Sequence, residues 1–374
     1  MRVQIVDPSA QTPPFDHSLS AALARLGAEV ELSTTRFVHG AVPEARGYAV
    51  SEAFYPRSSS MLSGSLRRRV TGLAEHVPGM LGHRRGAGAF DVINYQWLTL
   101  PGIDGRLLPS GPAKVWTTHG FLRAAEGGGI GAPRRALERM DAVIALSEFG
   151  AARLREDAGV PAERIEVIPH GVFEYLARLP ERPLPPELRD PAGPVILSFG
   201  LIRPYKGVDV LLRAFAELEP HAELWIVGRP LGVDMAEIEA LADAAAGRVR
   251  ILTRFVDDAD LPSIFNAARV VALPYRDVDQ SGVLATALAF GKAIVASDVG
   301  GFGEVAAVGD GEPAIALVPP GDAGELAATL SRLLGDRVER ERLQAAAQAA
   351  AAGPYSWDRV AAETLALYER LASR

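Results

Sequence analysis

The feature that most constrains the fold is an alternation of short apolar segments with longer amphipathic ones, which restarts near the middle of the chain. Strands that alternate with helices are typical of a parallel sheet covered by helices on both faces. The sequence therefore predicts the α/β class. A chain of 374 residues is longer than one hydrophobic core usually serves, and its 48% of hydrophobic residues can fill two cores. We therefore expect two such doubly wound domains.

The expected strands are short runs rich in Val, Ile and Leu. In the first half they are RVQIV, EVELST, DVINYQW, AKVWTTH, AVIAL and IEVIPHG, with a helix over about residues 18–25. In the second half they are VILSFG, ELWIVG, VRILTRF, VVALPY, AIVAS and AIALV. In the second half, helices are expected to begin at residues 208, 261 and 323 and to cover about 235–246 and 283–290.

A proline-rich stretch, RPLPPELRDPAGP, separates the two halves. Prolines at this density are incompatible with a helix or a central strand, so we interpret the stretch as an interdomain linker. The expected organisation is a first domain over 1–178, a linker over 179–194, a second domain over 195–353 and a C-terminal helix over 354–374 that crosses back. Ligands bind at the carboxyl ends of such sheets, so we expect the two domains to face a central cleft that closes by hinging.

Composition argues against several function classes. A formal net charge of −7 argues against a nucleic-acid partner, because a phosphate backbone selects a basic surface. The absence of cysteine excludes disulfides, thiolate metal sites and a thiol nucleophile, and favours a cytoplasmic setting. The segment MRVQIVDPSA lacks the apolar run of a signal peptide, and no stretch is apolar over the roughly 18 residues of a membrane span.

The segment VILSFGLIRPYKGVDVLL joins an apolar strand to an amphipathic helix through a loop that carries Arg203 and Lys206. The N-terminus of a helix offers unpaired backbone N–H groups and the positive end of its dipole. A guanidinium and an ammonium group beside it add charge-assisted donors. This combination predicts a site that holds a diphosphate.

Three further positions have both a functional and a structural interpretation. Ser281 and Gly282 precede a helix, where glycine lets the backbone approach a ligand, but an ordinary N-cap and turn need the same residues. Glu304 follows two glycines and is either a site residue or a charge at a helix start. His119 follows a strand, where it either makes structural hydrogen bonds or contacts a substrate.

The segment between Arg57 and Arg85 is rich in arginine, with leucines, methionines and glycines between; its arginines include Arg67, Arg68, Arg69, Arg84 and Arg85. One interpretation is a solvated helix face. The other is a patch that docks anionic lipid headgroups or a lipid-diphosphate substrate, because basic amphipathic helices attach to membranes without spanning them.

Several of these segments together resemble the retaining, nucleotide-sugar-dependent glycosyltransferases of family four, which have the GT-B architecture of two Rossmann-like domains. The most specific blocks, in chain order, are FGLIRPYKGVDVLL, ELWIVG, RFVDDADLPSIFNAARVVALPY and QSGVLATALAFGKAIVASDVGGFGE. In the first half, TPPFDHSLSAALARLGAEVEL, VWTTHG and VIPHG are similar to shorter family segments. The resemblance covers nearly the whole chain.

The resemblance implies transfer of a sugar from a UDP- or GDP-type donor to a hydroxyl of a glycan, lipid-linked or natural-product acceptor. No cofactor is implied, since the nucleoside diphosphate sugar is a co-substrate. The implied site consists of the catalytic His119, the acceptor residues Asp16 and His17, the nucleobase residues Phe255 and Val256, and the diphosphate ligands Arg203, Lys206, Ser281, Gly282 and Val283. Because two cations and backbone N–H groups can neutralise the diphosphate, we expect no catalytic metal.

One departure from the family pattern affects the sugar contacts. Most members have two glutamates, one facing the donor sugar and one the ribose. The corresponding positions here are Thr286 for the second and Val278 or Asp279 for the first. Asp279, Thr286 and Glu304 are the candidates for the sugar or ribose contacts, and two alternatives stay open: a GT-B sugar-nucleotide 2-epimerase and a non-catalytic nucleotide-sugar-binding subunit.

Overall fold

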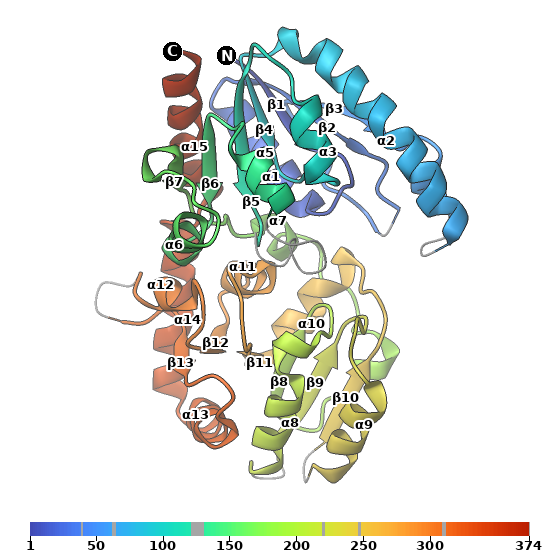
Figure 1. Ribbon diagram of the computed structural model, residues 1–374. Coiled ribbons are helices and arrows are strands. Elements are labelled where there is room, and N and C mark those ends of the chain that lie inside the picture. Colours follow the sequence, from blue (N-terminus) through green and yellow to red (C-terminus); the bar gives the residue numbers. More distant parts are fainter. Residues whose placement is uncertain are drawn as a thin grey trace. The chain divides into compact units, whose positions relative to one another are not determined.

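The computed structural model describes residues 1–38, 40–61, 65–120, 131–218, 221–245, 248–308 and 312–373. The chain forms two compact units, Met1–His170 with Trp357–Arg374 and Gly171–Ser356. Each unit contains one parallel sheet with helices packed against it, so the predicted α/β class is confirmed (Figure 1).

The first unit is built on a seven-stranded sheet in the order β3-β2-β1-β4-β5-β6-β7. Its strands are β1 (Arg2–Asp7), β2 (Glu29–Thr35), β3 (Ala49–Phe54), β4 (Val92–Tyr95), β5 (Ala113–Thr118), β6 (Ala142–Ala145) and β7 (Ile165–Val167). Its helices are α1 (Pro13–Arg25), α2 (Leu66–Gly86), α3 (Pro101–Leu107), α5 (Gly131–Leu137), α6 (Glu148–Glu156) and α15 (Trp357–Ala372). The chain adds β2 and β3 on one side of β1 and then β4 to β7 on the other, so the carboxyl ends of β1 and β4 lie at a switch point, which is typical of ligand sites.

The second unit contains a six-stranded sheet in the order β10-β9-β8-β11-β12-β13. Its strands are β8 (Val195–Phe199), β9 (Glu223–Val227), β10 (Arg248–Leu252), β11 (Ala268–Leu273), β12 (Ala293–Ser297) and β13 (Ala316–Val318). Its helices are α7 (Glu174–Ala177), α8 (Val208–Ala216), α9 (Met235–Ala244), α10 (Leu261–Ala267), α11 (Gly282–Ala289), α12 (Phe302–Ala306), α13 (Ala323–Gly335) and α14 (Arg337–Ala352).

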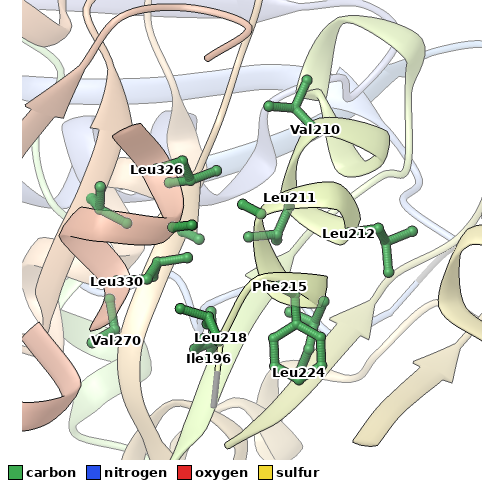
Figure 2. Packing of buried hydrophobic residues seen from close by; sticks show 14 of the residues in the cluster. Ile196, Val210, Leu211, Leu212, Phe215, Leu218, Leu224, Val270, Leu326 and Leu330 are labelled. Carbon is green, nitrogen blue, oxygen red and sulfur yellow. The ribbon is translucent and has the colours of Figure 1, made fainter. Parts of the chain in front are cut away.

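The core of the second unit holds the site-bearing strands in place. Helices α8 and α13 press apolar side chains such as Leu211 and Leu330, both 0% exposed, onto the sheet (Figure 2). Phe215 of α8 and Ile196 of β8 belong to the same buried cluster. Truncating a buried Phe of this kind to Ala typically costs about 3–5 kcal/mol. The strand and helix that flank the loop carrying Arg203 are therefore rigidly anchored.

Some element boundaries differ from the expectation. Helix α1 begins at Pro13 and not near residue 18, because proline fits the first turn of a helix, where its missing N–H needs no partner. The mostly exposed strand β3 has no clear apolar alternation, and the sequence does not predict it. Residues 171–194, which include the expected linker, lie in the second unit, and α15 packs on α1 within the first.

None of the helices in the described ranges is both long enough and apolar enough to cross a bilayer.

Candidate active site

The second unit presents its candidate site at the carboxyl edge of its sheet. β8 and β11 are neighbours in the sheet. β9 and β10 follow on the side of β8, and β12 and β13 follow on the side of β11. Such a switch point leaves a crevice between the two following loops. One of these loops carries Arg203 and Lys206, and the other leads into α11.

The loop after β8 is shaped by two glycines with positive φ. Gly200 has φ +94° and Gly207 has φ +65°, which few other residues adopt. A Cβ on Gly207 would lie 2.0 Å from the carbonyl oxygen of Pro274, in the loop after β11. Glycine is therefore required for the close approach of the two loops.

Lys206 lies at the point where the two loops meet. Its side chain is 7% exposed, and its Nζ donates to the carbonyl oxygen of Phe199 at 3.3 Å. A Cβ on Gly200 would lie 2.8 Å from Lys206 Nζ and 2.9 Å from Val283 Cγ2. The structure thus brings the ammonium group and the first turn of α11 to the same side of Gly200.

Two polar side chains near this point have atoms without partners. Arg203 is half-buried, and its Nε is buried with no hydrogen bond. In the loop before α11, the amide oxygen of Gln280 is also buried and unpartnered, a residue that the sequence did not single out. Buried polar atoms normally have partners, so a site with orphan atoms fits a missing polar ligand.

Ser281 acts as the N-cap of α11. Its Oγ accepts from the backbone N–H of Leu284 at 3.3 Å. The ordinary structural role of Ser281 is therefore present, and it is compatible with a ligand at the helix start, because the first N–H groups of a helix lack intrahelical acceptors.

A further pair, missed at the sequence level, ties the two loops together. The guanidinium of Arg276 donates to both carboxylate oxygens of Asp209, at 2.8 and 2.6 Å, and its backbone N–H donates to the carbonyl oxygen of Tyr205 at 2.7 Å. Burial raises the pKa of Asp209, but the hydrogen bonds from Arg276 outweigh this effect and hold that pKa below its ordinary value. This bidentate pair positions the loop that carries Lys206.

The expected sugar and ribose residues have different surroundings. Thr286 is 4% exposed, and its hydroxyl donates to the carbonyl oxygen of Gly282 within α11 at 2.8 Å. Asp279 is half-buried, whereas Val278 is 3% exposed. Glu304 lies in the first turn of α12, where its charge adds to the effect of burial in raising the pKa of Tyr355. Their contacts with a donor stay predictions.

The two expected nucleobase residues follow β10. Phe255 is 48% exposed, whereas Val256 is 6% exposed. Only Phe255 presents a large side-chain surface to solvent, so a stacking role is open to it and not to Val256.

In the first unit, His119 lies at the carboxyl end of β5. Its Nε2 bonds to Oε1 of Gln96 at 2.8 Å, and its ring lies between Phe15 and Trp97, with centroids 4.6 and 5.5 Å away. Burial lowers the pKa of His119 to about 3, so the ring is neutral near pH 7. Because Gln96 Oε1 accepts from Nε2, the buried and unpartnered Nδ1 is left as a hydrogen-bond acceptor.

Asp16 and His17 lie in α1 and are buried. Asp16 is 1% exposed and shares a hydrogen bond with the buried carboxyl of Asp7. Burial and the neighbouring charge of Asp7 raise the pKa of Asp16 well above its ordinary range. His17 bonds through Nδ1 to the Tyr48 hydroxyl at 2.6 Å, and burial lowers its pKa to about 4. These contacts give both side chains a structural role, and their contact with an acceptor stays a prediction.

Within the described ranges, no three His, Asp or Glu side chains gather in a group that could hold a metal ion. Metal-independent chemistry stays a prediction.

Comparison with known proteins covers both units. Residues 193–336 match the family model described as glycosyl transferases group 1, and residues 17–173 match that of glycosyltransferase family 4. D-inositol 3-phosphate glycosyltransferase of Xylanimonas cellulosilytica is 32% identical over 95% of this chain and 90% of its own length.

Two solved structures show the same fold. Sucrose-phosphate synthase from Thermosynechococcus elongatus superposes with a TM-score of 0.74 at 18% identity, covering 100% of this chain and 99% of its own. HepE of Anabaena in complex with UDP and glucose superposes with a TM-score of 0.71 at 22% identity, covering 100% of both chains. With its two Rossmann-like GT-B domains and a relative of this identity along nearly its whole length, the chain belongs to glycosyltransferase family 4 and is a hexosyltransferase-type enzyme that uses sugar-nucleotide donors.

Proposed function

We propose that the protein transfers a sugar from a UDP- or GDP-type donor to an acceptor hydroxyl with retention of the anomeric configuration. The observation that carries the proposal is the convergence of Lys206 Nζ and the first turn of α11 on Gly200. The unpartnered Nε of Arg203 in the same loop supports it. HepE of Anabaena, which shares the fold, binds UDP in its crystal structure, and this agrees with a nucleoside diphosphate donor.

The second unit stabilises the leaving group in this proposal. As the bond between the anomeric carbon and the diphosphate oxygen breaks, negative charge develops on the diphosphate. Arg203, Lys206 and the backbone N–H groups of residues 281–283 stabilise that charge. Because these donors are already fixed in the fold, little reorganisation is needed when the charge forms, and no metal ion is required.

Retention follows if the acceptor attacks from the face that the diphosphate leaves. The acceptor oxygen bonds to the anomeric carbon, and its proton passes to an oxygen of the departing diphosphate. His119 has the chemistry of a neutral hydrogen-bonding group and not of a cation, because burial lowers its pKa to about 3. We assign it to contact with the donor sugar or the acceptor.

Peripheral contact with a membrane is a finer part of the proposal and rests on α2. Four apolar side chains spaced four, three and four residues apart are exposed on this helix: Leu66 76%, Val70 61%, Leu73 60% and Val77 37%. The same helix carries five arginines. An apolar stripe with flanking arginines is the pattern of a helix that lies on an anionic lipid surface.

The proposal is tested by mass spectrometry and proton NMR after incubation with a panel of UDP- and GDP-sugars and an acceptor extract, NMR being needed because an epimer has the same mass as its donor. A free nucleoside diphosphate together with a glycosylated acceptor supports a transferase. An epimerised donor would instead identify a 2-epimerase, and binding without turnover would identify a non-catalytic subunit. Parallel reactions in excess EDTA test the metal, and the anomeric coupling constant of the product tests retention.

A further inference from the structure

Gln96 is the first residue after β4, and His119 is the first residue after β5, the neighbouring strand of the first sheet. Because the two strands are parallel, both side chains start from the same edge of the sheet. The backbone N–H of Gln96 donates to the carbonyl oxygen of Val6 in β1 at 2.8 Å, and its side chain is 0% exposed. Gln96 therefore presents a buried amide from a fixed backbone position beside His119.

Three neighbours fix the imidazole of His119. Gln96 Oε1 accepts from its Nε2 at 2.8 Å. The indole of Trp97 is stacked on the ring, with the centroids 5.5 Å apart and the planes at 14°, and Phe15 meets it edge-on, with the centroids 4.6 Å apart. A side chain held by packing and by a hydrogen bond keeps one orientation. The remaining nitrogen, Nδ1, therefore has a fixed direction.

Trp97 is itself held by a buried network at the start of α1. Its Nε1 donates to Oγ1 of Thr12 at 2.9 Å, and the Thr12 hydroxyl donates to Oδ1 of Asp16 at 3.3 Å. Asp16 is 1% exposed. The aromatic surface that packs on His119 is therefore set by buried side chains of another element.

Each member of the Gln96–His119 pair has one polar atom left over. Among the described residues, Nε2 of Gln96 and Nδ1 of His119 are buried and have no hydrogen-bond partner. An amide oxygen can only accept, so Nε2 of His119 carries the proton and Nδ1 has the lone pair. His119 is half-buried, so part of its ring can be reached by a ligand. Buried polar atoms normally have partners, and the unfilled acceptor fits a hydroxyl of a bound sugar.

The surroundings keep this imidazole uncharged. Burial and, as a smaller effect, the charge of His170 lower the pKa of His119 to about 3. The acidic pair in the neighbouring network is engaged elsewhere: Asp7 accepts from the backbone N–H groups of residues 9, 11 and 12, and Asp16 accepts from Thr12. A carboxylate in place of the Gln96 amide would favour the imidazolium, because an opposite charge at this distance stabilises the charged form.

We propose that Gln96 is a positioning residue of the transfer reaction: it holds His119 uncharged and protonated on Nε2, so that Nδ1 accepts a hydrogen bond from a hydroxyl of the donor sugar or of the acceptor. This inference rests on the proposed function, because it concerns the form in which His119 meets the reacting sugars. Gln96 acts through His119 and needs no contact of its own with a substrate.

The first test determines the tautomer of His119 in the full chain by nitrogen-15 NMR with labelled histidine, the signal being assigned by its loss in His119→Asn. We expect the neutral Nε2–H form at every pH from about 5.5 to 8, because the pKa of about 3 lies well below this range. A neutral Nδ1–H form, or an imidazolium at about pH 6, would overturn the proposal.

Gln96→Glu adds a proton-binding group with little change in shape. In acid the added proton reaches Nδ1 of His119 in either of two ways. A carboxylic acid would donate to Nε2 and leave the ring proton on Nδ1, and a carboxylate would pair with an imidazolium. In both cases Nδ1 can no longer accept. We therefore expect the ratio of kcat in the variant to kcat in the wild type to fall about tenfold from about pH 8 to about pH 5.5. A ratio that does not change with pH would contradict the role of Gln96.

Gln96→Met removes the acceptor and keeps the length of the side chain. We expect kcat to fall about three- to tenfold, with little change in the affinity for UDP or GDP measured by calorimetry. Gln4→Met is the matched control, because Gln4 is also a buried glutamine of the first sheet and its amide bonds to Glu31 instead. Unfolding temperatures are measured for both variants. An equal fall of kcat in the two would make Gln96 a structural residue only.

The same experiments separate this inference from the proposed function. Failure of the proposed function shows as no transferred sugar with the wild-type chain. Failure of this inference shows as the other tautomer, or as a constant ratio of kcat values in Gln96→Glu, while transferred sugar is still formed.

Discussion

The two units have the same kind of parallel sheet, but the groups at the carboxyl edge of each sheet are positioned by different means. In the second unit, the groups at the carboxyl edge are set by glycines and close backbone approaches, as at Gly200 and Gly207. In the first unit, they are set by side-chain pairs far apart in sequence, such as the buried pair of His76 with Asp104 and the partly buried pair of His119 with Gln96. The difference teaches that one sheet edge can be shaped mainly by close backbone approaches and another mainly by paired side chains.

The largest expected effect concerns the cations of the second unit. Arg203→Ala and Lys206→Ala should each lower kcat/KM at least tenfold, because losing a charged donor to a buried phosphate costs about 2–4 kcal/mol. Steady-state kinetics with the best donor measures this. Arg342→Ala, an exposed arginine on α14, is the matched control. Near-normal turnover in both site variants would remove the contrast between the two units.

The second prediction is a loss of stability in acid that is confined to the first unit. Burial lowers the pKa values of His17 and His83 to about 4 and of His119 to about 3. Below the ordinary value of 6.5 the unfolded chain therefore binds protons that the folded chain does not, so stability falls as pH falls from 6.5 towards 4. The Asp7–Asp16 pair opposes this, because the folded pair keeps a proton that both unfolded carboxyls lose above 3.8.

On unfolding, the three imidazoles take up three protons and the carboxyl pair releases one, so the unfolded chain binds about two more protons than the folded chain. The free energy of unfolding therefore falls by at most about 3 kcal/mol per pH unit. Hydrogen exchange, corrected for its intrinsic pH dependence, should show protection lost in first-unit peptides. The second unit has one histidine, the exposed His221, and should change less. Equal loss in both units would contradict the assignment of buried neutral histidines to the first.

A smaller effect is expected from His119→Ala. We predict a fall in kcat of about ten- to a hundredfold, which is the effect of one lost hydrogen bond of about 1–3 kcal/mol, with little change in the affinity for UDP or GDP. Single-turnover kinetics and calorimetry separate the two quantities. His221→Ala serves as the control. A collapse of nucleotide affinity in a folded variant would show that His119 is misassigned.

The smallest effect concerns positioning in the second unit. Arg276→Ala removes the bidentate pair with Asp209, and because Arg276 is 42% exposed we expect a cost of only about 1 kcal/mol. The loss should appear in donor KM more than in unfolding temperature, since the pair orients the loop that carries Lys206. A drop in stability without a change in KM would make the pair structural only.

The fold of the second unit was predictable from the sequence, and the residues of its candidate site lie close together in the chain. The strand, the loop cations and the helix start follow one another within VILSFGLIRPYKGVDVLL, and the structure places Lys206 against the start of α11. What it missed there, Arg276 with Asp209, joins positions 67 residues apart. No local spacing rule indicates such a pair.

The first unit was less predictable. Asp16 and His17 look like loop residues in sequence, but α1 begins at Pro13 and carries both into the interior. Tyr55, His76 and Asp104 form a hydrogen-bonded chain and come from the residue after β3, from α2 and from α3, and β3 itself has no clear apolar alternation. The positive φ of Tyr55 cannot be predicted from the residues next to it in the sequence.

A crystal structure with UDP or GDP, grown in the presence of a metal chelator, tests the diphosphate site most directly. We expect the diphosphate in the second unit, with its oxygens within about 3 Å of Arg203, Lys206 and the backbone N–H groups at the start of α11. A diphosphate bound elsewhere, or binding that appears only when a divalent cation is restored, would contradict a site built from these residues alone.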